Sequence, residues 1–317
     1  MAMNLVRLRI KPLGSWLTPW QADTLLGALA SVCARAYGTQ RLERDLLEPW
    51  QAGEPPFVLS DAFPGDFLPA PACLSLWPWP EEKRKVVKRS QWLSQEQFRD
   101  LQSGRQPVLS DETTKKLQSD VRMRNTLDRQ LDSTGLSGSL YETPATVLAQ
   151  NCPCLSLYAK IAAGKEALLG ELMGCLTEFG FGADASVGQG HFEWDGRFED
   201  ASWLTKVDAA DGWISLSTFQ PDHRDPTDGY WRSFVKYGKL GPDFGVEGVF
   251  KRPQWMLRPG SCFREEGIVR DWYGRVIGGS ELLSASTANE LAASGVHPVQ
   301  AVFACAVPMK WTKEYKP

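Results

Sequence analysis

A glycine-rich stretch, residues 180–190, contains the side chains and backbone best suited to bind a phosphate. Glycines can adopt positive φ and let a ligand approach closely, and the amides and hydroxyls of such a loop can receive phosphate oxygens. The stretch is not a Walker loop, because no Gly-Lys-Ser/Thr follows and it leads into a strand. The alternative is a long turn whose glycines only cap a helix. The candidate contacts are Gly182, Ser186, Gly188, Gln189, Gly190 and the following His191.

Histidine and carboxylate chemistry has little support in the sequence. His191 is a conceivable general base, but the sequence places no second histidine or tyrosine beside it, and an unpaired base makes a poor nuclease. His223 lies among Asp222, Asp225 and Asp228, whose spacing of three differs from the alternate-residue spacing of a calcium loop. The chain has no Ser-His-Asp set, P-loop or dinucleotide fingerprint. We therefore expect no catalytic residue, no metal and no cofactor.

Basic side chains form local islands, although the chain of 317 residues has a net charge of −3. Residues 81–90 hold five basic and two acidic side chains and include Lys85, Lys88 and Arg89. Residues 115–129 have the same balance, and the segment up to residue 142 adds an aromatic side chain. Basic groups along a backbone and aromatics under bases are the means by which proteins hold single-stranded RNA. The alternative is a solvated, charged loop. The candidates on this segment are Arg122, Arg124, Asn125, Arg129 and Tyr141.

Two strand–helix units are indicated by the hydrophobic pattern. Residues 4–10 and 155–161 alternate like half-buried strands, and each run precedes an apolar stripe at helical spacing. Thr18 with Gln21 predicts a capping box at the first helix. A polar insertion at about 78–150 contains a short predicted helix, 94–102, and a turn-rich tip, 134–139, and the Arg122–Arg129 spacing would suit one face of a helix. We predict an α+β fold of two ferredoxin-like units, 1–200 and a degenerate 201–317, with the glycine loop and inserted arm in the first.

The chain is expected to be cytoplasmic. Its N-terminus lacks the apolar region of a signal peptide, and its longest apolar run, residues 25–34, is too short to cross a bilayer. Seven cysteines, an odd number, with one close pair at Cys152 and Cys154, do not form a disulfide framework or a zinc site. Reduced thiols are the expectation.

Several stretches in register resemble the RAMP superfamily of CRISPR-associated proteins. The segments are Trp20-Gln-Ala-Asp-Thr-Leu-Leu-Gly27, Leu59-Ser-Asp-Ala-Phe-Pro-Gly-Asp-Phe-Leu-Pro69, Arg124-Asn-Thr-Leu-Asp-Arg129 with Gly138-Ser-Leu-Tyr-Glu-Thr143, Lys251-Arg-Pro to Pro259-Gly-Ser-Cys-Phe263, and His297-Pro-Val-Gln300. Together with the helix, glycine loop and strand, they resemble the subunit of type III-A (Csm) complexes that grips the 5′ handle of the guide RNA. In the glycine loop, Ala183, Asp184 and Ala185 stand where such loops are often rich in glycine and lysine.

The resemblance implies a non-catalytic subunit whose partners are the guide RNA, the large polymerase-type subunit and the repeating backbone subunit. Gln21, in the first matching segment, joins the implied RNA contacts. Asp23 in the same segment is expected to be structural, although the backbone subunits of such complexes cut RNA with an aspartate. The alternative function is a metal-independent, guide-processing endoribonuclease with His191 as its base. A purely protein-bridging scaffold is a further alternative.

Overall fold

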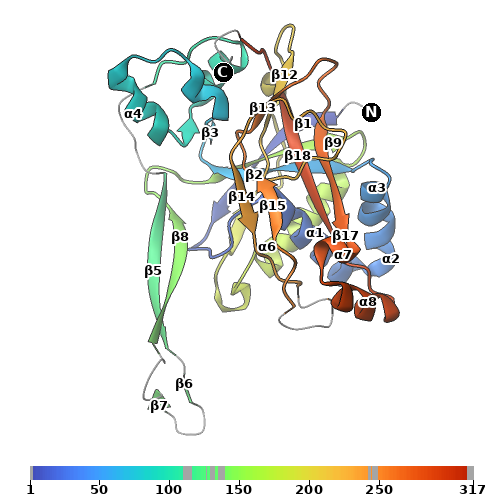
Figure 1. Ribbon diagram of the computed structural model, residues 1–317. Helices are drawn as coiled ribbons and strands as arrows, with labels where there is room; N and C mark the ends of the chain where they lie inside the picture. Colours follow the sequence, from blue (N-terminus) through green and yellow to red (C-terminus); the bar gives the residue numbers. More distant parts are fainter. Residues whose placement is uncertain are drawn as a thin grey trace.

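The computed structural model describes residues 3–109, 116–125, 127–128, 133–134, 140–241, 244 and 249–312. Figure 1 shows a body of packed sheets and helices from which one long hairpin projects. No helix among the described residues is long and apolar enough to cross a membrane.

The first sheet has the strand order of a ferredoxin-like unit. Its strands are β1 (Met3–Pro12), β2 (Phe57–Pro64), β9 (Leu155–Ala162) and β10 (Phe192–Trp194), in the antiparallel order β10-β1-β9-β2, and the short β11 (Glu199–Asp200) also pairs with β1. Helices α1 (Ala22–Tyr37) and α6 (Glu166–Phe179) follow β1 and β9 and pack on each other. Leu8 and Ile10 are fully buried, as the alternation of β1 predicts. The predicted ferredoxin-like layout is confirmed.

Helix α1 begins later than its sequence pattern indicates. The predicted capping box is wrong, because the N-cap is Gln21 and its side chain makes no cap hydrogen bond. The amide of Ala22 donates instead to Oδ1 of Asp61 on β2, at 2.9 Å. Beyond α1 the chain continues through α2 (Thr39–Leu42), a π-helical turn (Glu43–Leu47) and α3 (Glu48–Gln51) before it enters β2.

The insertion between β2 and β9 has two parts. The first contains β3 (Leu68–Pro69), a 3₁₀ turn (Ala72–Leu76), α4 (Glu81–Arg89), β4 (Trp92–Leu93) and α5 (Gln95–Gln102). Helix α5 confirms the prediction for 94–102, and Ser94 and Gln97 form its capping box. The second part is the projecting arm, a two-stranded ribbon of β5 (Leu117–Asn125) and β8 (Leu140–Leu148), with β6 (Leu127–Asp128) and β7 (Ser133–Thr134) beyond. Most of the predicted turn-rich tip, residues 135–139, lies outside the described residues.

The second unit is a five-stranded antiparallel sheet with the order β13-β16-β12-β18-β17. Its strands are β12 (Gly212–Ser215), β13 (Gly229–Tyr230), β16 (Cys262–Arg264), β17 (Trp272–Gly278) and β18 (Val299–Met309). A hairpin of β14 (Ser233–Lys236) and β15 (Gln254–Leu257) lies where a first crossover helix would stand, and α7 (Gly279–Leu282) and α8 (Ala285–Ala293) precede β18. The second unit is degenerate because a hairpin replaces one of the two helices of a ferredoxin-like unit. The predicted boundary at residue 200 stays a prediction.

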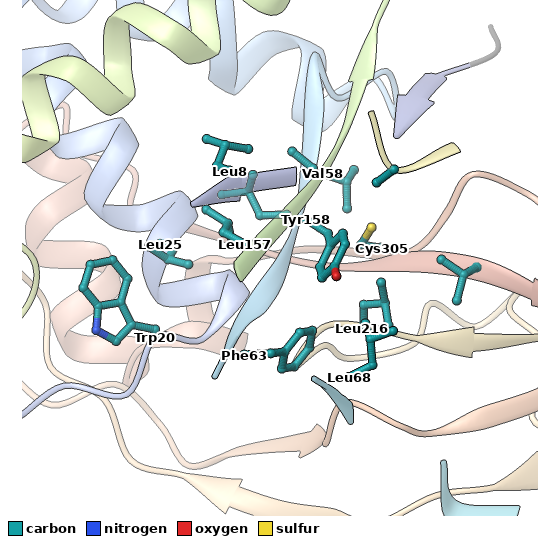
Figure 2. Packing of buried hydrophobic residues seen from close by; sticks show 14 of the residues in the cluster. Leu8, Trp20, Leu25, Val58, Phe63, Leu68, Leu157, Tyr158, Leu216 and Cys305 are labelled. Atoms are coloured by element: carbon teal, nitrogen blue, oxygen red, sulfur yellow. The ribbon is translucent and has the colours of Figure 1, made fainter. Parts of the chain in front are cut away.

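One hydrophobic core joins the two sheets. The side chain of Tyr158 on β9 is fully buried and lies close to Leu216 and Cys305 of the second unit (Figure 2). Lys160, two residues along β9, pairs with Asp271 at 2.8 Å. RNA-recognition motifs stack bases on aromatics of the open sheet face. That face is covered here at Tyr158 and Lys160, so bases cannot stack on it at these positions.

Candidate nucleic-acid interface

The arm presents Arg122 and Arg124 on the same face of β5. They are two residues apart on an extended strand, so their side chains point to the same side of the ribbon. Tyr141 on β8 is paired directly with Arg124 and therefore lies on this face as well. Asn125 lies on the opposite face, next to exposed Met123. The helical alternative for the arm is wrong at Arg122, and Arg129 lies outside the described residues.

The arginine-bearing face is turned toward the glycine loop. Nη1 of Arg124 lies 2.5 Å from Oδ2 of Asp184. Gln189 donates through its amide nitrogen to the hydroxyl of Ser15, at 2.8 Å, and accepts from Nη1 of Arg122, at 3.0 Å. Nε of Arg122 also contacts Asp120, its neighbour on the same strand face, at 3.1 Å. The arm and the glycine loop, which are far apart in the sequence, thus form one surface.

The base of the arm is fixed beside the loop by backbone hydrogen bonds. The amide of Trp16 donates to the carbonyl of Thr146 on β8 at 3.0 Å, and the amide of Thr146 donates back at 2.8 Å. Trp16 is buried, which holds this junction rigid. At the other strand, the ammonium of Lys116 lies over the ring of Phe67, 4.3 Å from its centroid.

The glycines at 182 and 190 are required by packing within the protein. Gly182 has φ +88°, and a Cβ there would lie 2.4 Å from Cβ of Thr18. Gly190 has φ +65°, and its Cβ would lie 2.0 Å from the carbonyl oxygen of Phe181. Gly188 also has positive φ, but a Cβ there would meet open space. Close packing against Thr18 and Phe181 therefore accounts for Gly182 and Gly190, whereas the helix cap of the sequence alternative is Gly180.

Several loop amides already have partners inside the protein. The amide of Ala183 donates to the hydroxyl of Thr18 at 2.8 Å, that of Gln189 to the carbonyl of Asp184 at 3.1 Å, and that of Gly190 to the carbonyl of Ser15 at 3.0 Å. These three amides are not directed at a ligand. Ser186 and Gly188 are exposed, whereas Gln189 and Gly190 are buried and can act only through their neighbours.

His191 braces the glycine loop. Its Nε2 lies 2.9 Å from the carbonyl oxygen of Ala185, and because a carbonyl only accepts, Nε2 carries the hydrogen. The carbonyl of His191 in turn accepts from the amide of Leu13 at 2.9 Å. The half-buried ring is thus oriented by the loop, and this nitrogen is not a proton acceptor.

The other predicted contacts lie elsewhere. Lys85, Lys88 and Arg89 are exposed on α4, which Figure 1 shows well away from the arm's outer end. Gln21 lies between the units, where its Oε1 accepts from Nζ of Lys236 at 2.8 Å. Figure 1 thus shows the basic helix α4 apart from the outer end of the arm.

Two buried aspartates, Asp23 in the first turn of α1 and Asp61 on β2, have structural partners. Asp23 accepts from Nζ of Lys236 and from the amide of Gln300, each at 2.8 Å. Asp61 accepts from the backbone and hydroxyl of Thr218, both at 2.7 Å, besides the amide of Ala22. Burial raises the pKa of Asp61 to about 6, against the effect of these donors. Both carboxylates bind the two units together.

Sequence reasoning missed three participants: Ser15, Asp184 and Lys236. Asp184 has a positive φ of 60°, which aspartate tolerates better than most residues, but this angle is known only from the structure. Residues 229–258 hold six basic and two acidic side chains, an excess spread over a segment at least twice as long as either island described above. Ser15 has no distinguishing local pattern.

No protein-family model and no curated protein sequence matches the chain. Solved structures do match. A chain in a crystal structure of a Csm1-Csm4 cassette in complex with pppApA is 17% identical, with a TM-score of 0.62, covering 98% of this chain and 99% of that one. A chain in a Csm3-Csm4 subcomplex of the type III-A CRISPR-Cas interference complex is 14% identical, with a TM-score of 0.54, covering 87% and 95%.

The chain accordingly shares the fold of these chains, a mixed α/β fold with several antiparallel sheets that is consistent with the ferredoxin-like folds of RAMP proteins. More particularly, it is the fold of Csm4, the component that these two assemblies have in common.

Proposed function

We propose that this chain is a non-catalytic RNA-binding subunit of a type III CRISPR effector complex in the cytoplasm, where it anchors the 5′ handle of the guide RNA. The observation that carries the proposal is the convergence of Arg122 and Arg124 on the glycine loop. Both guanidiniums lie on one face of a projecting ribbon, and Tyr141 lies beside them with 48% of its surface exposed. Guanidiniums pair with phosphates and an exposed ring can stack on a base.

The proposed protein partners are a large polymerase-type subunit and a repeating backbone subunit. The matching chains come from assemblies with Csm1 and with Csm3, and the match extends over nearly the whole of this chain. By analogy, this chain would join the large subunit to the backbone filament.

The test is binding of the full-length protein to single-stranded RNA that carries the repeat-derived 5′ handle. We expect Arg122→Ala with Arg124→Ala to weaken binding at least tenfold, because charge-assisted contacts contribute about 1.5–3 kcal/mol each. Arg44→Ala is the matched control, since Arg44 is exposed and also pairs with an aspartate close in sequence, Asp45.

The salt dependence gives a second measurement. Each phosphate neutralised on a single strand contributes about −0.7 to the slope of log K against log salt. The double variant should therefore flatten the slope by about 1.4. An unchanged affinity and slope, with intact circular dichroism, would place the RNA away from the arm.

The absence of catalysis is also part of the proposal. Purified protein incubated with repeat RNA should leave it intact, because His191 offers Nε2–H to a carbonyl and the sequence places no second histidine or tyrosine beside it. Cleavage that His191→Ala abolishes would establish the guide-processing endoribonuclease instead.

A further inference from the structure

The hairpin β14–β15 exposes an aromatic face that the RNA contacts above leave unused. Val235 and Trp255 are direct cross-strand partners, and they are 47% and 44% exposed. Tyr237 continues the alternation from Val235 and is 75% exposed. Phe250, which bridges to Lys239 farther along the hairpin, is 64% exposed. We call Val235, Tyr237, Phe250 and Trp255 the hairpin face.

One cation lies over a ring of the hairpin face. The ammonium of Lys239 lies over the ring of Phe250, 4.7 Å from its centroid. The guanidinium of Arg258 also lies over a ring, that of Phe234 at 4.4 Å, but Phe234 shares the buried face of β14 with Lys236 and is not part of the hairpin face. Residues 229–258 hold six basic and two acidic side chains, of which Lys236 and Lys251 are directed inward to Asp23 and Gln300. A polyanion with flat, stackable groups is the ligand complementary to such a surface.

The hairpin is joined to the proposed RNA site through α1. Lys236, on the buried face of β14, donates to Gln21, Asp23 and Thr24 at the start of that helix. The residue before Gln21 is Trp20, whose ring lies 4.4 Å from that of Phe181 in the glycine loop. One helix terminus thus connects the hairpin and the glycine loop.

We propose that the hairpin face is a second contact surface for the same single-stranded RNA. Bases stack on Tyr237 and Trp255, and Lys239 neutralises an adjoining phosphate. The inference rests on the proposed function and extends its site from the first unit onto the second. Protein–protein interfaces are enriched in tyrosine, tryptophan and phenylalanine but depleted in lysine. The lysine that lies over the ring of Phe250 is therefore the feature that favours RNA over a protein partner here.

The test compares full-length variants in binding a fluorescently labelled single-stranded RNA that carries the 5′ handle. Stacking contributes enough per base that Tyr237→Ala with Trp255→Ala should weaken binding about tenfold or more. Tyr237→Phe with Trp255→Phe retains both rings and should stay within about twofold of wild type. Ile268→Ala is the control, because Ile268 is an apolar side chain of the second unit, 93% exposed, outside the hairpin. RNA containing 4-thiouridine should crosslink to the peptides that hold Tyr237 or Trp255.

The outcomes separate this inference from the proposed function. If wild type binds no RNA, both fail. If binding depends on Arg122 and Arg124 but is unchanged in the Tyr237→Ala, Trp255→Ala variant, only the second surface is refuted. If that variant binds RNA normally but no longer associates with the large or backbone subunit, the hairpin face is a protein interface and the inference is overturned.

Discussion

The guanidinium of Arg124 contacts the carboxylate of Asp184 at 2.5 Å, although 60 positions separate the two residues in the sequence. Arg124 is 27% exposed and Asp184 37%. The pair fixes the arm against the glycine loop. It also means that a phosphate which binds Arg124 must compete with a carboxylate already in place.

We therefore predict that Asp184→Asn strengthens binding of handle RNA severalfold and steepens its salt dependence. Asparagine tolerates the positive φ of this position, so the change removes charge with little strain. Asp195→Asn, on an exposed turn of the same unit, should change little. Weaker binding by Asp184→Asn would mean that the carboxylate positions Arg124 for RNA instead of competing for it.

Two glycines of the glycine loop should differ in how much they contribute to the free energy of unfolding. Gly190→Ala should lower the free energy of unfolding by more than about 4 kcal/mol, because its Cβ would overlap the carbonyl of Phe181. Gly188→Ala should cost only about 1–2 kcal/mol, from its positive φ alone. Urea denaturation followed by circular dichroism measures both. Equal costs would show that the loop relaxes around Gly190.

Asp61 should make stability fall as pH rises. Because burial raises its pKa to about 6 in the folded state, against 3.8 unfolded, the folded protein binds the proton more tightly between these values. The contribution of Asp61 is thus present below about pH 4 and is lost as pH rises through about 6.

Asp61→Asn removes this titration and keeps an acceptor for the amides of Ala22 and Thr218. Thermal unfolding at several pH values should show wild type losing up to about 3 kcal/mol relative to the variant between pH 4 and 7. A wild type that instead gains stability with pH would show that the three donors outweigh burial.

The Lys236–Asp23 pair should be structural. Lys236→Met leaves a buried carboxylate without its cation and should destabilise the protein by about 3–5 kcal/mol. Adding Asp23→Asn should recover part of the loss, because the unpaired charge is then removed. Lys11→Met is the control, since its pair with Glu193 is more than half exposed on both sides. Additive effects in this double-mutant cycle would refute the coupling.

A fragment that ends at residue 200 should fold poorly alone. It would expose Tyr158, which lies close to Leu216 and Cys305 of the second unit, and leave Asp61 without Thr218. We expect broad thermal unfolding and binding of a hydrophobic dye, both corrected by co-expression with residues 201–317. A fragment with sharp unfolding would show that the first unit is independent and would allow its RNA binding to be measured directly.

Local patterns in the sequence determined the elements of the first unit. Several of these patterns depend on residues only a few positions apart. They are the strand alternation at 4–10 and 155–161, the apolar stripes of α1 and α6, and the capping box of Ser94 and Gln97. Such signals act within one element, so the order strand, helix, strand, insertion, strand, helix, loop, strand follows from them. The position of the glycine loop between α6 and β10 was predictable for the same reason.

Only the tertiary structure decided what these elements face. Register within the arm puts Arg122 and Arg124 on one side, and a shift of one residue would turn both away from the glycine loop. Gln189, predicted as a contact, is buried beneath Arg122, and the sheet face of β9 is covered by the second unit. These outcomes depend on strand pairing and on packing between segments far apart in the chain. No periodicity records such contacts, because periodicity reports which side of an element is buried and not which segment covers it.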